Sequence, residues 1–438
     1  MWKKPIVWIP VVLAAALTLT ALPWSDKAQA DVSLKAPRAV QWSDFLGVDA
    51  QFQYFDPAVY QKQMAALDAL GLSWVRLSIH WAVIEPTEGN IDFTALDGAM
   101  SAMAAHKYNI VAYLVGSAPF ATSAPVGAAA QDQYSPKDVN VFANRMVTLA
   151  KRYPQVNTWQ PWNEPNITWR PVPDSAAYGK LLLATTTALR AAVPTANVGT
   201  AGMAYYSQNP ANGSLMLADL LQGLAANKLI VSYHPYSQYP EGDDPAAKDF
   251  IQRGNLVNTT LHNHGVTQVW ATEWGWSSYA GPVELQPIIG VNGQADYTLR
   301  RLALMSAMDY QRIFLFNLTD LDARASARDQ FYGLVDLNGD PKPVYTALKN
   351  LFDVTGSRIE PADAPAYTNS PGDLYNVAWT RADGSHLWMF WSASGSSVTL
   401  PTVTSATLID PLNGARTTLA NDKGISVPLK TSLQLLIW

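Results

Sequence analysis

The stretch WQPWNEPN, residues 159–166, decides the fold that this sequence predicts. Apolar residues lead into it from Val156, and it ends abruptly in the polar run at 163–166. This profile is typical of a buried strand whose tip carries a carboxylate, here that of Glu164. Pro165 ends the strand, because proline cannot donate a hydrogen bond to a neighbouring strand.

A second stretch, QVWATEWGW at residues 268–276, has the same form. Its apolar run ends in Glu273, which has tryptophans on both sides. Two carboxylates at the tips of two buried strands, in aromatic surroundings, are what hydrolysis of a glycosidic bond with retention of configuration requires. The pair therefore indicates where the chemistry of this chain is located.

Strand-like and helix-like segments alternate along most of the chain. Strands are predicted around Glu164 and at 45–52, 74–81, 110–115, 198–203, 229–234, 269–273 and 313–318. Helical spacing of apolar residues predicts helices at 57–70, 93–106, 135–153, 175–192, 214–224, 248–264, 294–308 and 343–352. Eight strand–helix units in succession favour an α/β protein with a (β/α)8 TIM barrel. An open doubly wound sheet is the alternative, but the glycine-rich phosphate loop expected after its first strand is missing from the sequence.

In such a barrel, Glu164 ends strand four and Glu273 ends strand seven. The carboxyl ends of all eight strands lie at one face, where barrel enzymes build their active sites. We therefore expect the two carboxylates to meet across the barrel mouth despite their separation in sequence.

The pattern changes after about residue 356, where helical spacing disappears. Short strands are predicted at 376–379, 386–391, 406–409, 426–429 and 433–438, with turns at 382–384 and 411–414. This predicts a small antiparallel β-sandwich domain at 357–438 behind a catalytic barrel at 31–356. A separate carbohydrate-binding role for the small domain is the alternative to a packing role.

The composition excludes several classes of function. The chain of 438 residues has a net charge of −5 and only 15% charged residues, so a nucleic-acid-binding protein is not expected. It contains no cysteine, which excludes disulfides and cysteine-ligated metals. The 16 tryptophans and 19 tyrosines supply core packing or flat platforms for sugar rings. We expect a monomer that needs no metal and no cofactor.

Residues 1–30 have the order of a secretory signal peptide. Lys3 and Lys4 precede an apolar run at 5–22, and Ala28-Gln29-Ala30 precedes the expected cleavage site before Asp31. An uncleaved N-terminal anchor in the inner membrane is the alternative. Either way, the main body is predicted to be exported to the periplasm or the extracellular space.

The motif Trp162-Asn163-Glu164-Pro165-Asn166, with Thr272-Glu273-Trp274, resembles the clan A glycoside hydrolases, and family 39 most of all. The signal peptide, barrel and β domain together are similar to the PslG-type members, which cleave bacterial exopolysaccharide. This resemblance implies that Glu164 is the general acid/base and Glu273 the nucleophile. It leads us to expect carboxyl groups about 5–5.5 Å apart.

The chemistry makes a matching demand on the neighbours of each carboxyl group. The acid must keep its proton, and the nucleophile needs donors that keep it ionised. We expect Arg76 to donate to Glu273, with pairing to a structural acid such as Asp49 as the alternative. His234 and Tyr236 end strand six beside strand seven and are expected to orient Glu273. Asn163 is expected to bind the sugar 2-hydroxyl.

The remaining candidates have a packing alternative. His80 ends strand two and is either a substrate contact or a core residue. Trp169, Trp274 and Trp276 are either sugar platforms or rim packing. Strand eight departs from many clan A barrels, because Phe316-Asn317 stands where a tryptophan is common.

Two further patterns carry no site. The calcium-like loop at 336–340 has Pro341 where such a loop needs glycine, and Ala347 where it needs glutamate. His262 and His264 have no third ligand in the sequence pattern and are expected at the surface.

The sequence leaves three functions open. The first is an endo-glycosidase that acts on a polysaccharide, and the second is an exo-acting enzyme similar to β-xylosidases. The third is a non-catalytic polysaccharide-binding or assembly protein, against which the intact pair of glutamates argues.

Overall fold

The computed structural model describes residues 31–204, 222–244, 249–281 and 287–438. The predicted signal peptide and most of the helix predicted at 214–224 lie outside these ranges. Within them, no helix combines the length and hydropathy needed to cross a bilayer. The chain forms two compact units. The first contains Ser43–Ser277 and Tyr310–Asp340, and the second contains Ser278–Asp309, Pro341–Trp438 and the described residues before Ser43.

The first unit is built on one parallel sheet, ordered β7-β6-β5-β4-β3-β11-β10-β9-β8. Its strands are β3 (Leu46–Asp49), β4 (Trp74–His80), β5 (Asn109–Val115), β6 (Val156–Pro161), β7 (Asn197–Val198), β8 (Met203–Ala204), β9 (Ile230–His234), β10 (Gln268–Trp274) and β11 (Arg312–Leu315). The two edge strands, β7 and β8, are consecutive in the chain, and Gly199 between them pairs with Ile230 of β9. The sheet therefore closes on itself, and the (β/α)8 prediction is confirmed over the doubly wound alternative.

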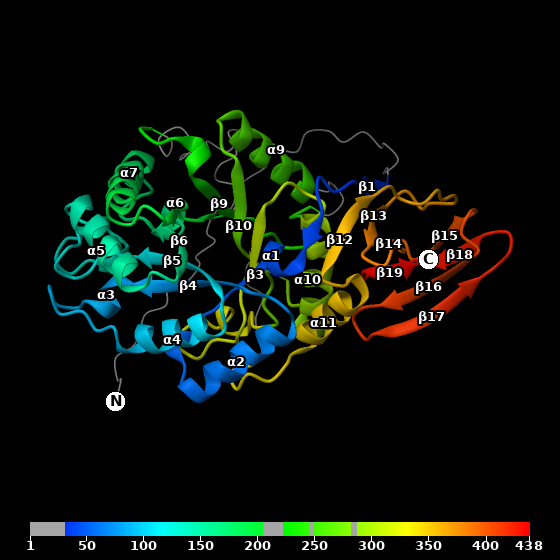
Figure 1. Cartoon of the computed structure of the whole chain (residues 1–438), viewed down its shortest axis with the longest axis horizontal. Coiled ribbons are helices and arrows are strands. Elements are labelled where there is room, and N and C mark those ends of the chain that lie inside the picture. The colour runs from blue at the N-terminus through cyan, green and yellow to red at the C-terminus, as the bar shows by residue number, and fades with distance from the viewer. Residues whose placement is uncertain (1–30, 205–221, 245–248, 282–286) are drawn as a thin grey trace. The chain divides into compact units, whose positions relative to one another are not determined.

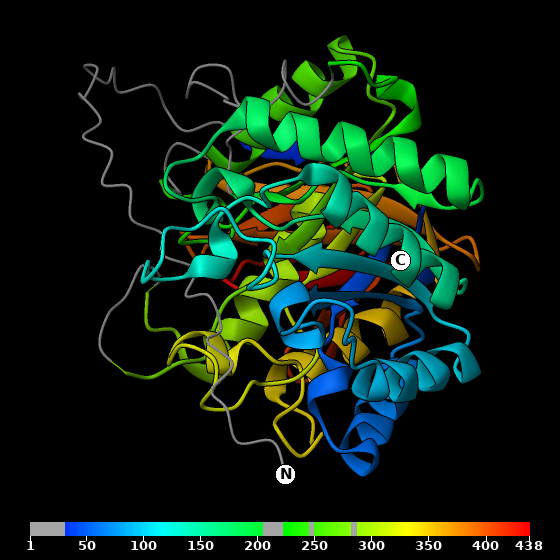
Figure 2. The ribbon, with the colours of Figure 1, turned by 90° about the vertical axis from the view of Figure 1, so that its left-hand side faces the viewer.

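The outer helices of this unit are α2 (Pro57–Ala69), α4 (Thr94–Ala105), α5 (Val139–Arg152), α7 (Ser175–Ala192) and α9 (Asp249–Asn263). They lie around the strands in Figures 1 and 2. Shorter helices are α1 (Trp42–Phe45), η1 (Phe52–Tyr54), α3 (Trp81–Ile84), η2 (Gln131–Gln133), α6 (Pro165–Thr168), η4 (Ala226–Lys228) and η5 (Asp329–Phe331).

Aspartate caps set where three of the outer helices begin. The side chains of Asp56, Asp138 and Asp174 accept hydrogen bonds from backbone N–H groups in the first turns of α2, α5 and α7. The predicted start of α5 at residue 135 is wrong. Asp138 is the cap, and Pro136 pairs instead with Thr122 in the preceding loop.

Aromatic side chains fill the interior of the barrel. Trp270 and Phe314 form a buried cluster with Val111 and Ile230, and Trp74 packs against its edge. Gly47 makes room for this cluster, since a Cβ there would lie 2.5 Å from the Phe314 ring. Each buried large side chain contributes about 1.5–3 kcal/mol. This packing gives the strand tips a rigid support.

The second unit contains the predicted antiparallel sheet and two helices, α10 (Gly290–Ser306) and α11 (Pro343–Thr355). Its large sheet has the order β17-β16-β19-β14-β13-β12-β2, and β1 pairs with β13. The strands are β1 (Val32–Leu34), β2 (Val40–Gln41), β12 (Arg358–Ala362), β13 (Leu374–Arg381), β14 (His386–Ser392), β16 (Ser405–Asp410), β17 (Ala415–Ala420) and β19 (Gln434–Ile437). A second sheet pairs β15 (Ser397–Leu400) with β18 (Ile425–Pro428). One apolar core includes residues of both sheets, among them Trp388, Phe390, Val398 and Val427.

Candidate active site

Glu164 lies just beyond β6, in a turn of unusual backbone geometry. Trp162 and Glu164 both have positive φ, 78° and 46°. The N–H of Glu164 donates to the carbonyl of Gly202 at 3.0 Å, and α6 begins at Pro165 immediately afterwards. Non-glycine residues adopt positive φ at a cost of about 1–3 kcal/mol, and such residues concentrate at functional sites. The unusual backbone of the Asn-Glu-Pro turn therefore orients the carboxyl group of Glu164, in addition to ending the strand.

Glu273 lies within β10, where the pairing with β11 shifts register between Ala271 and Trp274. Gly275 follows with φ of +156°, and a Cβ at this position would lie 2.4 Å from the carbonyl oxygen of Phe316. Glycine is required here because no side chain fits against the backbone of strand eight. The irregularity helps to orient Glu273 at the strand end.

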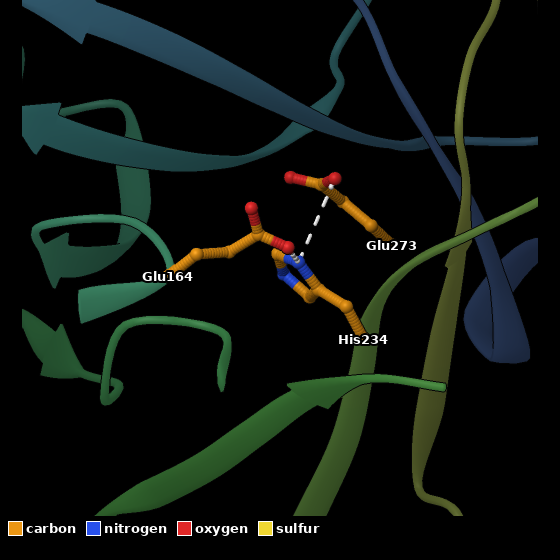
Figure 3. Close-up of side chains that lie close together, drawn as sticks. All are labelled: Glu164, His234 and Glu273. Atoms are coloured by element: carbon orange, nitrogen blue, oxygen red, sulfur yellow. Dashed lines mark hydrogen bonds and ion pairs between the residues drawn. The ribbon is translucent and has the colours of Figure 1, made fainter. Parts of the chain in front are cut away.

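The two glutamates face each other, and the ring of His234 lies beside both (Figure 3). One carboxylate oxygen of each glutamate and Nδ1 of His234 lie within 4.8 Å of one another. Retaining glycosidases hold their carboxyl groups about 5–5.5 Å apart, whereas inverting enzymes leave about 6.5–9.5 Å for a water molecule. The nearest oxygens of the two glutamates lie within 4.8 Å of each other, which is compatible with the retaining arrangement. Three ligand atoms this close could also hold a metal ion.

Arg76 is completely buried and contacts both of the partners that the sequence offered for it. Its Nη1 donates to Oε1 of Glu273 at 2.7 Å and to Oδ1 of Asp49 at 2.8 Å. Its Nε and Nη2 donate to the amide oxygens of Gln160 and Asn163. Burial lowers the pKa of Arg76, but Asp49 and Glu273 are among the groups that raise it above its usual value. Glu273 thus has a permanent positive charge beside it.

His234 lies closer to Glu164 than to Glu273, which corrects the sequence-based prediction. Its Nδ1 lies 2.9 Å from Oε1 of Glu164 and 3.6 Å from Oε2 of Glu273, and its Nε2 lies 3.0 Å from Oγ1 of Thr272. Burial lowers the pKa of His234 to about 3, so the ring is neutral near pH 7. A Cβ at Gly202 would lie 1.9 Å from Nε2, so glycine at that position allows the ring to reach Glu164.

Tyr236 occupies its predicted place beside Glu273. Its hydroxyl donates to Oε2 of Glu273 at 3.2 Å. Burial raises the pKa of Tyr236 well above its usual value, and the charge of Glu273 adds to this. The phenol therefore remains protonated and can act as a donor. Arg76 and Tyr236 together supply one donor to each carboxylate oxygen of Glu273.

The environment of Glu164 has the opposite effect on its carboxyl group. Burial raises the pKa of Glu164 to about 7, although Arg76 opposes the shift. Two loop residues after β11 act in opposite directions, since Asp329 raises this pKa and Arg328 lowers it. Its neighbour His234 is neutral, and among the described residues no charged side chain donates a hydrogen bond to Glu164. Glu164 therefore keeps its proton up to near-neutral pH.

The tryptophan candidates are buried, which favours packing over sugar stacking. Trp169 packs on Trp162 with ring centroids 4.8 Å apart, and Nε1 of Trp276 donates to two backbone carbonyls. Trp274 has no exposed surface. A sugar platform must expose a ring face, and these three rings do not. His80 is half-buried at the end of β4, and burial lowers its pKa to about 4.

Sequence reasoning missed two members of the site. Gln160 accepts from Arg76 and donates to the carbonyl of Thr200, and its only signal in the sequence was a buried amide in an apolar strand. Phe316 is an aromatic residue at the end of strand eight, with its ring edge-on to Tyr332 at 5.3 Å. Unlike the three tryptophans, it is only half-buried.

Comparisons with known proteins agree with this fold. A family model for beta-galactosidases of glycoside hydrolase family 42 matches residues 49–125. A family 39 glycoside hydrolase from the gut symbiont Bacteroides cellulosilyticus is similar with a TM-score of 0.69 and 18% identity, over 92% of this chain and 82% of that chain. A monomeric beta-xylosidase from Caulobacter crescentus has a TM-score of 0.63 and 16% identity, over 93% and 98% of the two chains.

A family 30 endoxylanase from Clostridium papyrosolvens is similar with a TM-score of 0.58 and 11% identity, over 93% of this chain and 99% of that chain. A search of curated protein sequences finds no match. The chain therefore has the fold of the glycoside hydrolases of families 39 and 30, a barrel with an attached β domain.

Proposed function

We propose that this chain is a retaining glycoside hydrolase of clan A, with Glu164 as acid/base and Glu273 as nucleophile. The observation that carries the proposal is the pair of neighbouring carboxyl groups with opposite surroundings. Glu164 is buried beside a neutral histidine, and its pKa is raised to about 7. Glu273 accepts hydrogen bonds from Arg76 and Tyr236. Environments that separate two carboxyl groups in this way define the acid and the base.

In the first half of the reaction, a carboxylate oxygen of Glu273 attacks the anomeric carbon. The bond from that carbon to the leaving oxygen breaks, and the leaving oxygen takes the proton of Glu164. The products of this step are a glycosyl ester on Glu273, an ionised Glu164 and the released alcohol. Desolvation of Glu164 favours this transfer, because the site keeps the acid protonated until the leaving group needs it.

In the second half, ionised Glu164 removes a proton from a water molecule whose oxygen attacks the anomeric carbon. The bond between that carbon and Glu273 breaks, which restores the carboxylate of Glu273 and the acid form of Glu164. Arg76 and Tyr236 already point at the two oxygens where the negative charge returns. Donors held in place before the charge develops lower the barrier without reorganisation.

For the substrate, we favour endo-cleavage of a bacterial exopolysaccharide by an exported, monomeric enzyme. The sequence resemblance to PslG-type hydrolases and the signal-peptide pattern of residues 1–30 support this proposal. Exo-cleavage is the second candidate, supported by similarity to a structure named as a beta-xylosidase. Similarity to a structure named as an endoxylanase supports endo-cleavage instead. The sizes of the released products distinguish the two.

The test uses the chain from Asp31 onward and a panel of bacterial exopolysaccharides and plant β-glycans. Reducing ends and product sizes are followed for the wild type and for Glu164→Gln and Glu273→Gln. We expect the wild type to release oligosaccharides from the start of the reaction, and both variants to lose this activity. Release of single sugars would support the exo candidate. Binding without cleavage in all three proteins would support the non-catalytic polysaccharide-binding alternative.

A further inference from the structure

Asp49 is a third buried carboxyl group at the site, and the mechanism above assigns it no role. It ends β3 and is 1% exposed. Its Oδ1 accepts from Nη1 of Arg76, the nitrogen that also donates to Glu273. One nitrogen therefore links Asp49 to the proposed nucleophile. The inference drawn below rests on the proposed function of Glu273.

The charges at this nitrogen do not balance if both carboxyl groups are ionised. One guanidinium faces two carboxyl groups, and Oδ2 of Asp49 has no hydrogen-bond partner among the residues that the structure describes. A buried carboxylate with so little compensation costs several kcal/mol, roughly. A proton on Oδ2 removes this cost and leaves Oδ1 free to accept from Arg76. Asp49 is therefore the neutral member of the pair while Glu273 is ionised.

The other groups around Asp49 agree with this assignment. Burial raises the pKa of Asp49 well above its usual range, and Glu273 raises it further while Arg76 opposes the shift. Tyr113 and Tyr236 lie within electrostatic reach of Asp49, and burial raises the pKa of each, so both phenols are neutral. The charged groups that face Asp49 are thus Arg76 and Glu273.

Formation of the glycosyl ester changes the Glu273 side of the contact that Asp49 and Glu273 share at Nη1 of Arg76. When Glu273 becomes an ester it loses its charge, and its oxygens become weaker acceptors for Arg76. Gln160 and Asn163 hold Nε and Nη2 of Arg76, but neither contacts Nη1. Among the hydrogen bonds of the described residues, Asp49 is the acceptor that Nη1 keeps once Glu273 is an ester. Without it, this end of the guanidinium could leave its position just before the charge on Glu273 must return.

We propose that Asp49 is a positioning residue, the neutral partner that keeps Nη1 of Arg76 in place while Glu273 alternates between carboxylate and ester. It touches neither the substrate nor the reacting atoms. Its effect falls on the second half of the reaction, because the positive charge of Arg76 is most needed when the ester bond breaks. Loss of Asp49 therefore slows release of the glycosyl-enzyme more than its formation.

The test compares Asp49→Ala and Asp49→Asn with the wild type and with Glu85→Gln. Glu85 is also a buried carboxylate paired with an arginine, but its partners are Arg145, Trp81 and Gly89. Each protein is trapped with 2,4-dinitrophenyl 2-deoxy-2-fluoro-β-D-xyloside or the corresponding glucoside. Excess reagent is removed, and the rates of trapping and of reactivation are measured by mass spectrometry.

We expect Asp49→Ala to be trapped at nearly the wild-type rate and to reactivate about 10- to 100-fold more slowly. Asp49→Asn should reactivate within about threefold of the wild type, since its amide oxygen still accepts from Arg76. Glu85→Gln should match the wild type. Reactivation of Asp49→Ala at the wild-type rate, or an equal slowing of trapping and reactivation, overturns the proposal.

A second measurement needs no substrate and separates this proposal from the function on which it rests. Urea unfolding of the wild type and Asp49→Asn is compared from pH 4 to pH 8. The folded state holds the Asp49 proton above the ordinary pKa of about 3.9, so the wild type should lose stability relative to Asp49→Asn as pH rises. A difference that does not change with pH overturns the neutral role of Asp49. If neither fluoroglycoside labels the wild type, that failure concerns the proposed function, and the unfolding comparison still decides the state of Asp49.

Discussion

The tips of β6 and β10 look alike in sequence and differ in chemistry. Each is an apolar run that ends in a glutamate among tryptophans. In the part of the chain that the structure describes, the partner of Glu164 is a neutral histidine, whereas Glu273 accepts from a buried guanidinium and a phenol. The difference comes from residues of other strands: His234 ends β9, Tyr236 follows it, and Arg76 lies in β4. A barrel can therefore give two similar strand tips opposite roles through their neighbours.

The largest expected effect comes from neutralising either glutamate. Glu273→Gln removes the nucleophile and should reduce kcat with any glycoside by at least about 10⁴-fold. Glu164→Gln removes the acid and should cost roughly 10²–10⁴-fold with an alcohol leaving group. The loss in Glu164→Gln should largely disappear for the first step with a dinitrophenyl glycoside, whose leaving group needs no proton.

Burst kinetics with the two kinds of substrate check this prediction. If both variants lose the dinitrophenyl glycoside reaction equally, the division of roles between the two glutamates is wrong.

Removing the charge of Arg76 tests the second tip directly. Arg76→Ala leaves the carboxylate of Glu273 without its cation, and Asp49 without its hydrogen-bond donor, in a buried site. This should lower the free energy of unfolding by about 3–5 kcal/mol. Urea unfolding at pH 7 measures the loss. A loss below about 1 kcal/mol, as for an exposed ion pair, would contradict the buried ion pair of Arg76 and Glu273.

The proton of Glu164 should also appear in the stability of the protein. Its pKa is about 7 in the folded state, so the folded state binds a proton that the unfolded chain releases above about pH 4.3. Stability from this group is fully present below that value and is lost as pH rises through 7. The wild type should thus lose about 3 kcal/mol relative to Glu164→Gln between pH 4 and pH 8. Urea unfolding curves across this range check the sign, and an opposite slope would indicate an ionised Glu164.

The space for His234 can be removed without touching any charged group. Gly202→Ala places a Cβ 1.9 Å from Nε2 of His234, so the ring must move away from Glu164. We expect a loss of about 1–3 kcal/mol in unfolding free energy and a shift in the alkaline limb of the kcat/KM profile. Gly98→Ala is the matched control, because its Cβ would have only an ordinary contact at 3.6 Å. An unchanged pH profile in Gly202→Ala would show that His234 does not influence Glu164.

The smallest effect is expected for Tyr236→Phe. The variant removes one hydroxyl donor from Oε2 of Glu273 and keeps the packing of the ring. One hydrogen bond to a charged group contributes about 1.5–3 kcal/mol, which corresponds to roughly 10- to 100-fold in kcat. Steady-state kinetics at neutral pH measure the change. A loss as large as that of Glu273→Gln would mean that Tyr236 takes part in the chemistry itself.

Local sequence was enough to predict the barrel and its two strand tips. Apolar strand-like runs, each followed by helical spacing, predict the order of the elements, and eight such units in succession favour a closed parallel barrel. The glutamates could be located for the same reason, since a strand tip lies at the carboxyl face wherever its strand pairs. Pro165 also indicated where the β6 tip ends, because proline cannot donate to a neighbouring strand.

Contacts between strands were decided only by the tertiary structure. The distances from His234 to Glu164 and Glu273 differ by less than 1 Å, and Gly202, just before β8, leaves the room that the His234 ring occupies. Trp274 and Trp276, candidate sugar platforms in the sequence, are buried and therefore serve packing. Arg76 donates to both Asp49 and Glu273, whereas the sequence analysis expected it to pair with one or the other. The sequence by itself determined which residues reach the carboxyl face, because that depends on periodicity along one chain segment. Only the tertiary structure decided their pairing and protonation, because those depend on sub-ångström distances and on desolvation by neighbours that are remote in sequence.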